Sequence, residues 1–439
     1  MRANTEDSSR SEEQAPTQRA KGAKALKMLR QLGPGLVTGA SGDDPSGIAT
    51  YCQAGAAMGY GMLWTMLASL PLVIAIQQIS ATIGRVTGKG IAGNMQGHYP
   101  KWLLHGVVLL VLVANIFNLG ADLIMMGDSL RLIVGGSTLV YVFSFAILIV
   151  LMEIFVPFKQ YERCLKGLTV TLFAYVATAF VVHVPWGQVI HSTLVPSITV
   201  SGQWFTALTA LLGTTISPYM FIWQAAEEVQ NEKTSAQERP LLKAPDQAKK
   251  HLRRISMDTR FGMVFSGVTA WFIMITAAAT LHAHGITDIQ NSTQAASALR
   301  PLAGPLAFYL FAAGIIGTGL LSVPVLAGSA AYAVGEALGL RVGLQYKPHQ
   351  ARRFYFILAG ASLVGLGMAL SGLNPIKALY ASAVINGVVA GPIMVVLVLM
   401  GTNRKIMGRF TLSPGLARFG WIAAAVMIIS ALALLGALR

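Results

Sequence analysis

Two adjacent carboxylates, Asp43 and Asp44, interrupt an apolar stretch of the chain. They belong to the segment "SGDDPSG", Ser41–Gly47, within "GPGLVTGASGDDPSGIATYCQAGAAMGYGMLW". A carboxylate inside a bilayer is costly and therefore indicates function. Because Pro45 biases Asp44 away from helical backbone, the Asp44 side chain and neighbouring carbonyls can converge on a cation. Such a set of oxygens suits a hard ion, Mg²⁺ or Mn²⁺, or less tightly Ca²⁺.

A second apolar segment carries a similar interruption, in "LLGTTISPYMFIWQAAEEV", residues 211–229. Its proline is Pro218, and the backbone carbonyls around Thr214 could close a site opened by Asp44. Broken helices are tolerated at mid-membrane where they line a cavity or bind something. Simple proline kinks are the alternative for both segments.

The composition indicates that the two broken segments belong to a protein with many membrane helices. Of 439 residues, 54% are hydrophobic and 12% are charged, whereas soluble domains have about 25% charged residues. We therefore predict an all-α polytopic membrane protein, surrounded by the lipid bilayer, with about eleven transmembrane helices. The expected spans are 33–57, 61–84, 103–127, 138–157, 163–184, 205–228, 257–281, 304–338, 353–371, 376–400 and 417–437.

Lysine and arginine predict the orientation of these spans. The net charge of +15 comes from short loops between spans, which excludes a nucleic-acid partner. These residues lie mainly on the side of the N-terminus, which places the N-terminus in the cytosol and the C-terminus outside. We expect residues 1–30 to be a disordered cytosolic tail, and 31–438 to be the transporter domain of a bacterial inner-membrane protein.

The two broken segments lie five spans apart, which predicts a 5+5 inverted repeat. The first repeat covers about 31–184, the second about 205–400, and 417–437 is an additional helix. Interrupted spans at matching positions of two inverted halves indicate a transporter site.

The same segments, with "GRVTGKG" between them, resemble the Nramp family of divalent metal transporters over about residues 30–400. The specific features are the glycine-proline-glycine entry, the aspartate-proline pair and the spacing of "QAG…GY…LW". The resemblance implies a LeuT-type fold with broken helices 1 and 6. It also implies a metal site that contains Asp44 and the Thr214 carbonyl.

Three positions depart from the main branch of that family. Gly47 replaces a metal-binding asparagine, Ser217 replaces a methionine, and Tyr219 replaces a histidine linked to proton movement. The site thus loses a soft ligand and an amide, which leaves room for water. Mg²⁺ commonly retains its water. The pattern is similar to the Nramp-related magnesium transporter branch, and we expect Asp44, Gly47, Thr214 and Ser217 to hold the metal.

Other polar residues are candidates for the ion path or for coupling. Asn118 and Asp122 lie near two acidic positions of the family, and Asp122 either relays protons or bonds to a polar neighbour. Asp43 is a second ligand, a partner of Asp44, or a residue facing a water-filled vestibule, which we favour. Gln53 is expected along the path, and Asn386 either joins helices or approaches the site.

The function predicted from these residues is secondary transport of divalent metal, Mg²⁺ or Mn²⁺, by alternating access. We expect neither an enzyme nor a cofactor, and a monomeric protein. The alternatives are a proton-coupled Mn²⁺/Fe²⁺ importer, a LeuT-type symporter of a small organic solute, and a metal sensor or channel. Three glutamates near span ends, Glu153, Glu227 and Glu228, are expected to be solvated.

Overall fold

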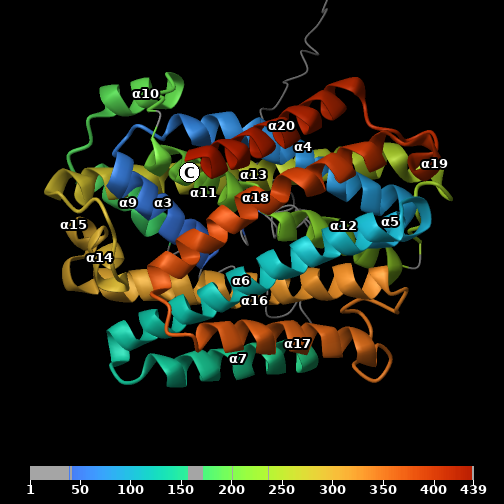
Figure 1. Cartoon of the computed structure of the whole chain (residues 1–439), viewed down its shortest axis with the longest axis horizontal. Helices are drawn as coiled ribbons and strands as arrows, with labels where there is room; N and C mark the ends of the chain where they lie inside the picture. The colour runs from blue at the N-terminus through green and yellow to red at the C-terminus, as the bar shows by residue number, and fades with distance from the viewer. Residues whose placement is uncertain (1–38, 40–41, 157–171, 200, 236, 438–439) are drawn as a thin grey trace, which may run out of the picture. The chain divides into compact units, whose positions relative to one another are not determined.

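The structure is a computed structural model that describes residues 39, 42–156, 172–199, 201–235 and 237–437. Within these residues all regular structure is helical (Figure 1). The expected tail, 1–30, lies outside the described residues. The α-helices are α3 (Pro45–Met58), α4 (Trp64–Thr87), α5 (Ile91–His98), α6 (Lys101–Val134), α7 (Thr138–Phe155), α9 (Phe173–Val181), α10 (Trp186–Leu194), α11 (Gly202–Thr215), α12 (Pro218–Thr234), α13 (Ala248–Thr280), α14 (Ser292–Ser297), α15 (Arg300–Ala303), α16 (Ala307–Ala337), α17 (Arg352–Ala369), α18 (Pro375–Thr402), α19 (Arg404–Met407) and α20 (Pro414–Ala437).

Eight helical segments among the described residues are long and apolar enough to cross a membrane. They include α4, α6, α7, α16, α18 and α20, the continuous segment that contains α11 and α12, and the segment that contains α13. The expected spans 33–57 and 163–184 lie partly outside the described residues, and α17 coincides with the expected span 353–371.

The second break has the form that the sequence predicts. Helix α11 ends at Thr215, Ile216 and Ser217 are non-helical, and α12 begins at Pro218. At the first break, Asp44 has extended backbone and Pro45 is the first residue of α3. Proline favours this first position because its missing N–H would have no partner there. Helices α3 and α12 therefore begin at the broken segments, and the backbone amides of their first turns lie beside Pro45 and Pro218.

The helices around the breaks pack closely. Helix α3 packs against α13, α12 against α4, α16 along α6, and α18 against α11 and α20 (Figure 1). A Cβ added to Gly213 would lie 2.1 Å from the carbonyl oxygen of Ala383. The backbones of α11 and α18 thus touch at this glycine, as small residues allow between membrane helices.

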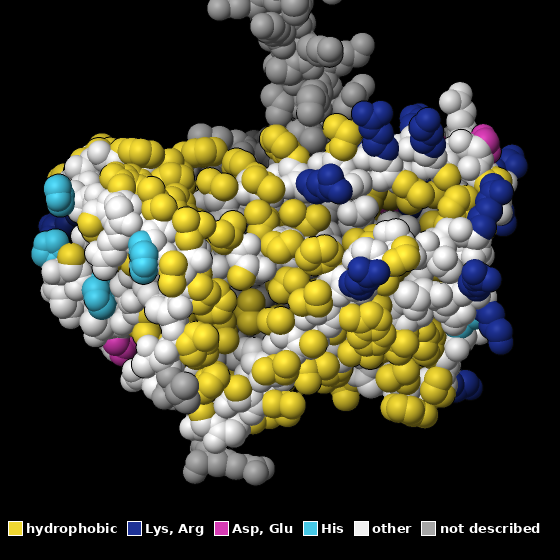
Figure 2. Space-filling model, turned by 90° about the horizontal axis from the view of Figure 1, so that it is seen from above, with side chains coloured by type: hydrophobic (Ala, Val, Ile, Leu, Met, Phe, Trp, Pro, Cys, Tyr) yellow, Lys and Arg dark blue, Asp and Glu magenta, His cyan; other side chains and the backbone are white. Residues whose placement is uncertain are grey.

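Charged side chains are distributed unequally between the two ends of the helices. Lysine and arginine gather at the end where α19 lies, and histidine gathers at the opposite end, near α10 (Figure 2). Apolar side chains cover most of the face between them (Figure 2). This distribution is the one that the lysine and arginine positions in the sequence predict.

Candidate metal site

Asp44 lies at the centre of the candidate site. It is the N-cap residue of α3, and its Oδ1 accepts from the backbone N–H of Gly47 at 2.6 Å. Its Oδ2 accepts from Asn118 Nδ2 at 3.0 Å and from the Tyr219 hydroxyl at 3.3 Å. Asp44 is buried, with 3% of its surface exposed. One carboxylate therefore joins α3, α6 and α12.

The other three predicted metal residues adjoin Asp44. A Cβ built on Gly47 would lie 3.3 Å from Thr214 Oγ1 and 3.4 Å from Asp44 Oδ1. The Ser217 hydroxyl lies 2.7 Å from the Gly213 carbonyl and 3.0 Å from the Thr214 carbonyl. The structure thus brings together the four residues that the sequence assigns to the metal, although their role as ligands remains a prediction.

A chain of hydrogen bonds extends from Asp44 to α18. The Oδ1 atom of Asn118 accepts from the Ser382 hydroxyl at 2.8 Å, and Asn386 Nδ2 lies 3.5 Å from the same atom. The Ser46 and Ser382 hydroxyl oxygens are 2.9 Å apart. Asn386 is therefore close to the site, in addition to joining helices.

Asp122 lies one helical turn from Asn118 on α6 and is fully buried. Its Oδ2 accepts from the Ser322 hydroxyl of α16 at 3.1 Å. Of the two roles expected for this residue, the structure shows the bond to a polar neighbour; proton relay remains a prediction.

Asp43 differs from our expectation. It is 1% exposed, and its Oδ1 accepts from Ser266 of α13 at 2.8 Å. Asp43 therefore does not face a water-filled vestibule, because its side chain points to α13 and is enclosed there. Pro45 restricts the backbone of Asp44 only, since a proline affects the residue before it. The sequence pattern therefore could not predict which helix covers Asp43.

Three oxygen atoms near the site have no hydrogen-bond partner. They are Asp43 Oδ2, Asp122 Oδ1 and Asn386 Oδ1. Buried polar atoms normally have partners, and acceptors in excess of donors are satisfied by a cation. No group of three His, Cys, Asp or Glu residues that could hold a metal occurs among the described residues. A metal here would depend on Asp44, neutral oxygens and water.

A cavity of about 1030 Å³ lies between α3, α11 and α18, and none of the four candidate metal residues lines it. Gln53 lines it, together with Ala381 and Tyr380. The Gln53 amide is fixed by the backbone of residues 287–289, since Nε2 donates to the Thr287 carbonyl and Oε1 accepts from the Ile289 N–H. Gln53 thus lines a cavity, and its place along an ion path stays a prediction.

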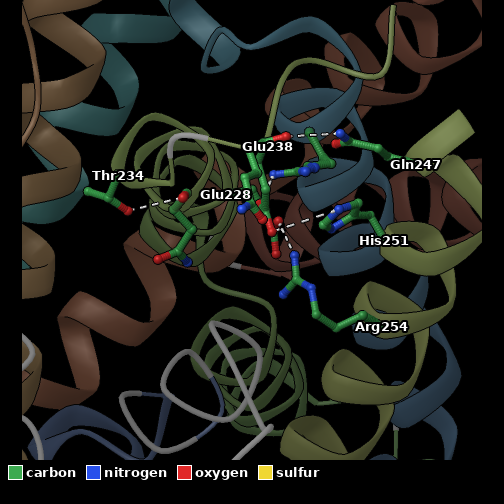
Figure 3. A network of polar contacts seen from close by, with 9 residues as sticks. Glu228, Thr234, Glu238, Gln247, His251 and Arg254 are labelled. Atoms are coloured by element: carbon green, nitrogen blue, oxygen red, sulfur yellow. Dashed lines mark hydrogen bonds and ion pairs between the residues drawn. The ribbon is translucent and has the colours of Figure 1, made fainter. Parts of the chain in front are cut away.

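At the opposite end of the helices, ion pairs connect a different set, α4, α12 and α13 (Figure 3). Glu228 of α12 accepts from Arg254 of α13 at 2.5 Å, and Arg85 of α4 pairs with Glu238 at 2.7 Å. His251 lies 3.9 Å from Glu238. We call these five residues the ionic network. They connect α4, α12, α13 and the segment between α12 and α13.

Two of the three glutamates expected to be solvated are buried. Glu228 is 0% exposed and Glu153 is 7% exposed, whereas Glu227 is partly buried and accepts from Trp223. The distance of Glu228 and Glu153 from a span end therefore did not predict their burial.

Four serines around the candidate site were not predicted from the sequence. Ser46 and Ser382 bond to each other, Ser266 donates to Asp43, and Ser322 donates to Asp122. Serine is common in membrane helices, and its presence does not indicate which helix it faces. The only signal was their position at the same depth as the broken segments.

Comparisons with known proteins agree on one family. A family model described as natural resistance-associated macrophage protein-like, Nramp, matches residues 35–437. The divalent metal cation transporter MntH of Klebsiella pneumoniae is 26% identical over 412 residues, which are 91% of this chain and 92% of that protein. A manganese transporter of Eremococcus coleocola has a similar structure, with a TM-score of 0.70 and 17% identity over 93% of this chain and 87% of that one. The chain belongs to the Nramp family.

Proposed function

We propose that this protein transports divalent metal cations, Mg²⁺ or Mn²⁺, across a membrane by alternating access. The observation that carries the proposal is the buried Asp44 carboxylate at the first helix break, which accepts from the Tyr219 hydroxyl of the second break at 3.3 Å. Relatives that cover nearly the whole chain are named as divalent metal and manganese transporters, which supports the same class of substrate.

The donor set favours a hard ion that keeps part of its water. Asp44 contacts both α3 and α12, and Ser217 and Thr214 add neutral oxygens, whereas Asn118 donates its amide N–H to Asp44. A single charge with neutral oxygens cannot replace a whole hydration shell, and Mg²⁺ usually retains several waters. Asn118 and Tyr219 can hold such waters through their polar side chains.

The cavity and the ionic network are consistent with one state of an alternating-access cycle. The cavity at Gln53 gives access from one end, and the ionic network closes the other. We propose that this state faces outward and that the lysine- and arginine-rich end in Figure 2 lies in the cytosol. The N-terminus would then be cytosolic and the C-terminus outside.

A proton-coupled Mn²⁺/Fe²⁺ importer is the second candidate. One observation favours it: the Met220 sulfur would lie 3.1 Å from a Cβ added to Gly42, two residues before Asp44. A thioether this close to the site could bind a softer metal. Met220→Leu should leave transport unchanged for the first candidate and weaken Mn²⁺ transport selectively for the second.

A flux assay in proteoliposomes separates the two candidates. Uptake of Mg²⁺, Mn²⁺, Ca²⁺ and Zn²⁺ would be measured with and without a pH gradient, with internal pH recorded. Our proposal predicts Mg²⁺ uptake, Mg²⁺ competition against Mn²⁺, and no proton entry coupled to the metal. Mn²⁺ uptake that ignores excess Mg²⁺ and acidifies the interior would establish the second candidate instead.

A further inference from the structure

A further buried carboxylate, Glu153, lies far from Asp44 along the chain and plays no part in the metal site. It is on the last turn of α7 and is only 7% exposed. Neither of its carboxylate oxygens has a hydrogen-bond partner. A buried carboxylate without a donor is costly, so its position indicates a ligand with hydrogen-bond donors.

Glu153 lines a cavity of about 370 Å³ between α7, α16 and residues 344–358. Gln345 lines the same cavity, and its Oε1 is also buried without a partner. The Tyr355 hydroxyl donates to the Tyr346 carbonyl at 2.9 Å, which leaves the Tyr355 oxygen free to accept. The polar atoms that face the cavity are therefore mainly acceptors.

These acceptors favour a primary ammonium group over a metal ion. One carboxylate and one amide oxygen are few ligands for a divalent metal, and the described residues contain no cluster of three acidic, histidine or cysteine side chains. A primary ammonium has three N–H donors, enough for both Glu153 and Gln345. Tyr346 and Tyr355 also line the cavity; the Tyr346 ring already stacks with the Arg341 guanidinium, 5.3 Å from its centroid, so an ammonium would use the Tyr355 ring.

The surroundings of the cavity are those of a membrane interface. Helix α7 is the least buried of the eight candidate spans, with 28% of its apolar window buried. Phe155, which lines the cavity, is 75% exposed, as is Phe356 on α17. In Figure 1, α7 and α17 lie side by side at the edge of the helices, where lipid chains would contact them.

Positive charge lies beside the cavity as well. Lys347 lines it without forming an ion pair with Glu153, and Arg352 and Arg353 are exposed at the start of α17. If the ammonium group of a ligand binds Glu153, a phosphate group next to it in the same ligand would lie near these positively charged side chains. This order of charges matches the headgroup of an aminophospholipid.

We propose that this cavity binds the headgroup of a phospholipid with a primary amine, of the phosphatidylethanolamine type. The ammonium lies between Glu153 and Gln345, the phosphate faces Lys347 and the α17 arginines, and the acyl chains lie along Phe155 and Phe356. Phosphatidylcholine, whose quaternary ammonium has no N–H, cannot satisfy the same acceptors.

Lipid retention measured by native mass spectrometry tests the proposal. The delipidated full-length protein would be incubated with equal amounts of dioleoyl phosphatidylethanolamine and dioleoyl phosphatidylcholine. We expect the wild-type protein to retain about tenfold more phosphatidylethanolamine than phosphatidylcholine, which is the effect of one charged hydrogen bond. Equal retention of the two lipids would overturn the proposal without any variant.

Two variants locate the preference. Glu153→Gln should remove it, and Gln345→Leu, in the segment before α17, should reduce it if Glu153→Gln fails to fold. Asp246→Asn removes an exposed carboxylate elsewhere and should keep the preference. A preference that persists in both cavity variants would overturn the assignment, as would displacement of the lipid by free ethanolamine at an equal concentration.

Discussion

The two ends of the helices differ in structure, because one contains a cavity and the other is joined by ion pairs. At one end, α3, α11 and α18 enclose a cavity of about 1030 Å³. At the other, α4, α12 and α13 are joined by the ionic network, in which Arg85 and Glu228 are each 0% exposed. The volume of the cavity at the hollow end depends on the sizes of the side chains that line it, and the contacts at the closed end depend on the charges of the ionic network. A change in size should thus affect the first end, and a change in charge the second.

The largest effect should follow from removing the group that both ends enclose. Asp44→Asn keeps the size of the side chain but removes the charge that neutralises the ion. We expect metal uptake into proteoliposomes to fall to the level of empty liposomes. Asp246→Asn, which removes an exposed charge, is the control; wild-type uptake by Asp44→Asn would contradict the site assignment.

Filling the hollow end should have the next largest effect. Ala381 lines the cavity, and Ala381→Trp would place an indole where the ion is proposed to pass, lowering uptake by about tenfold or more. Val364→Trp makes a similar enlargement at a position on α17 that is 56% exposed. If both variants transport equally, the cavity at Gln53 is not the path.

A smaller effect should follow from breaking the closed end. Glu228→Gln removes the carboxylate that pairs with Arg254. The equilibrium between the outward-facing state, in which the ionic network is intact, and the inward-facing state should shift toward the inward-facing state by about tenfold, or ~1.4 kcal/mol. The rate at which an impermeant maleimide labels a cysteine introduced at Gln53 should fall accordingly. Glu227→Gln changes the adjacent carboxylate, which accepts from Trp223, and should leave labelling unchanged. Equal rates in both variants would separate the ionic network from the state of the cavity.

The smallest effect should be a change in ion preference. Gly47→Asn with Ser217→Met restores an amide and a thioether, and should raise Mn²⁺ over Mg²⁺ uptake several-fold. A Cβ at Gly47 would lie 3.1 Å from the Gly42 carbonyl, so α3 must shift slightly. Gly47→Ala makes the same shift without a ligand; an equal change in preference there would show that packing, not ligation, sets selectivity.

The sequence predicted the hollow half of this comparison better than the closed half. Proline beside aspartate or serine is a local signal, and α3 and α12 begin where Pro45 and Pro218 predict. Asp44 and the Thr214 carbonyl could be named because they lie within four residues of those prolines, whereas Gly47 and Ser217 were named from the resemblance to the Nramp family. Charge asymmetry predicted which end is basic.

The closed end could not be predicted because its contacts join distant parts of the chain. Arg85 and Glu238 are 153 positions apart, and no periodicity relates them. Asp43 and Glu153 were misjudged for the same reason: burial depends on which helix covers a side chain. The identity of the covering helix depends on tertiary packing and not on the residues next to the side chain in the sequence.

The position of the two prolines has a consequence for how such a site can evolve. Because Pro45 and Pro218 each occupy the first position of a helix, the bend in the chain is encoded separately from the atoms that meet the ion. Neighbouring positions such as Gly47 and Ser217 are then free to vary while the scaffold keeps its shape. A lineage could exchange one cargo for another by point substitutions, with no need to redesign the path that carries it.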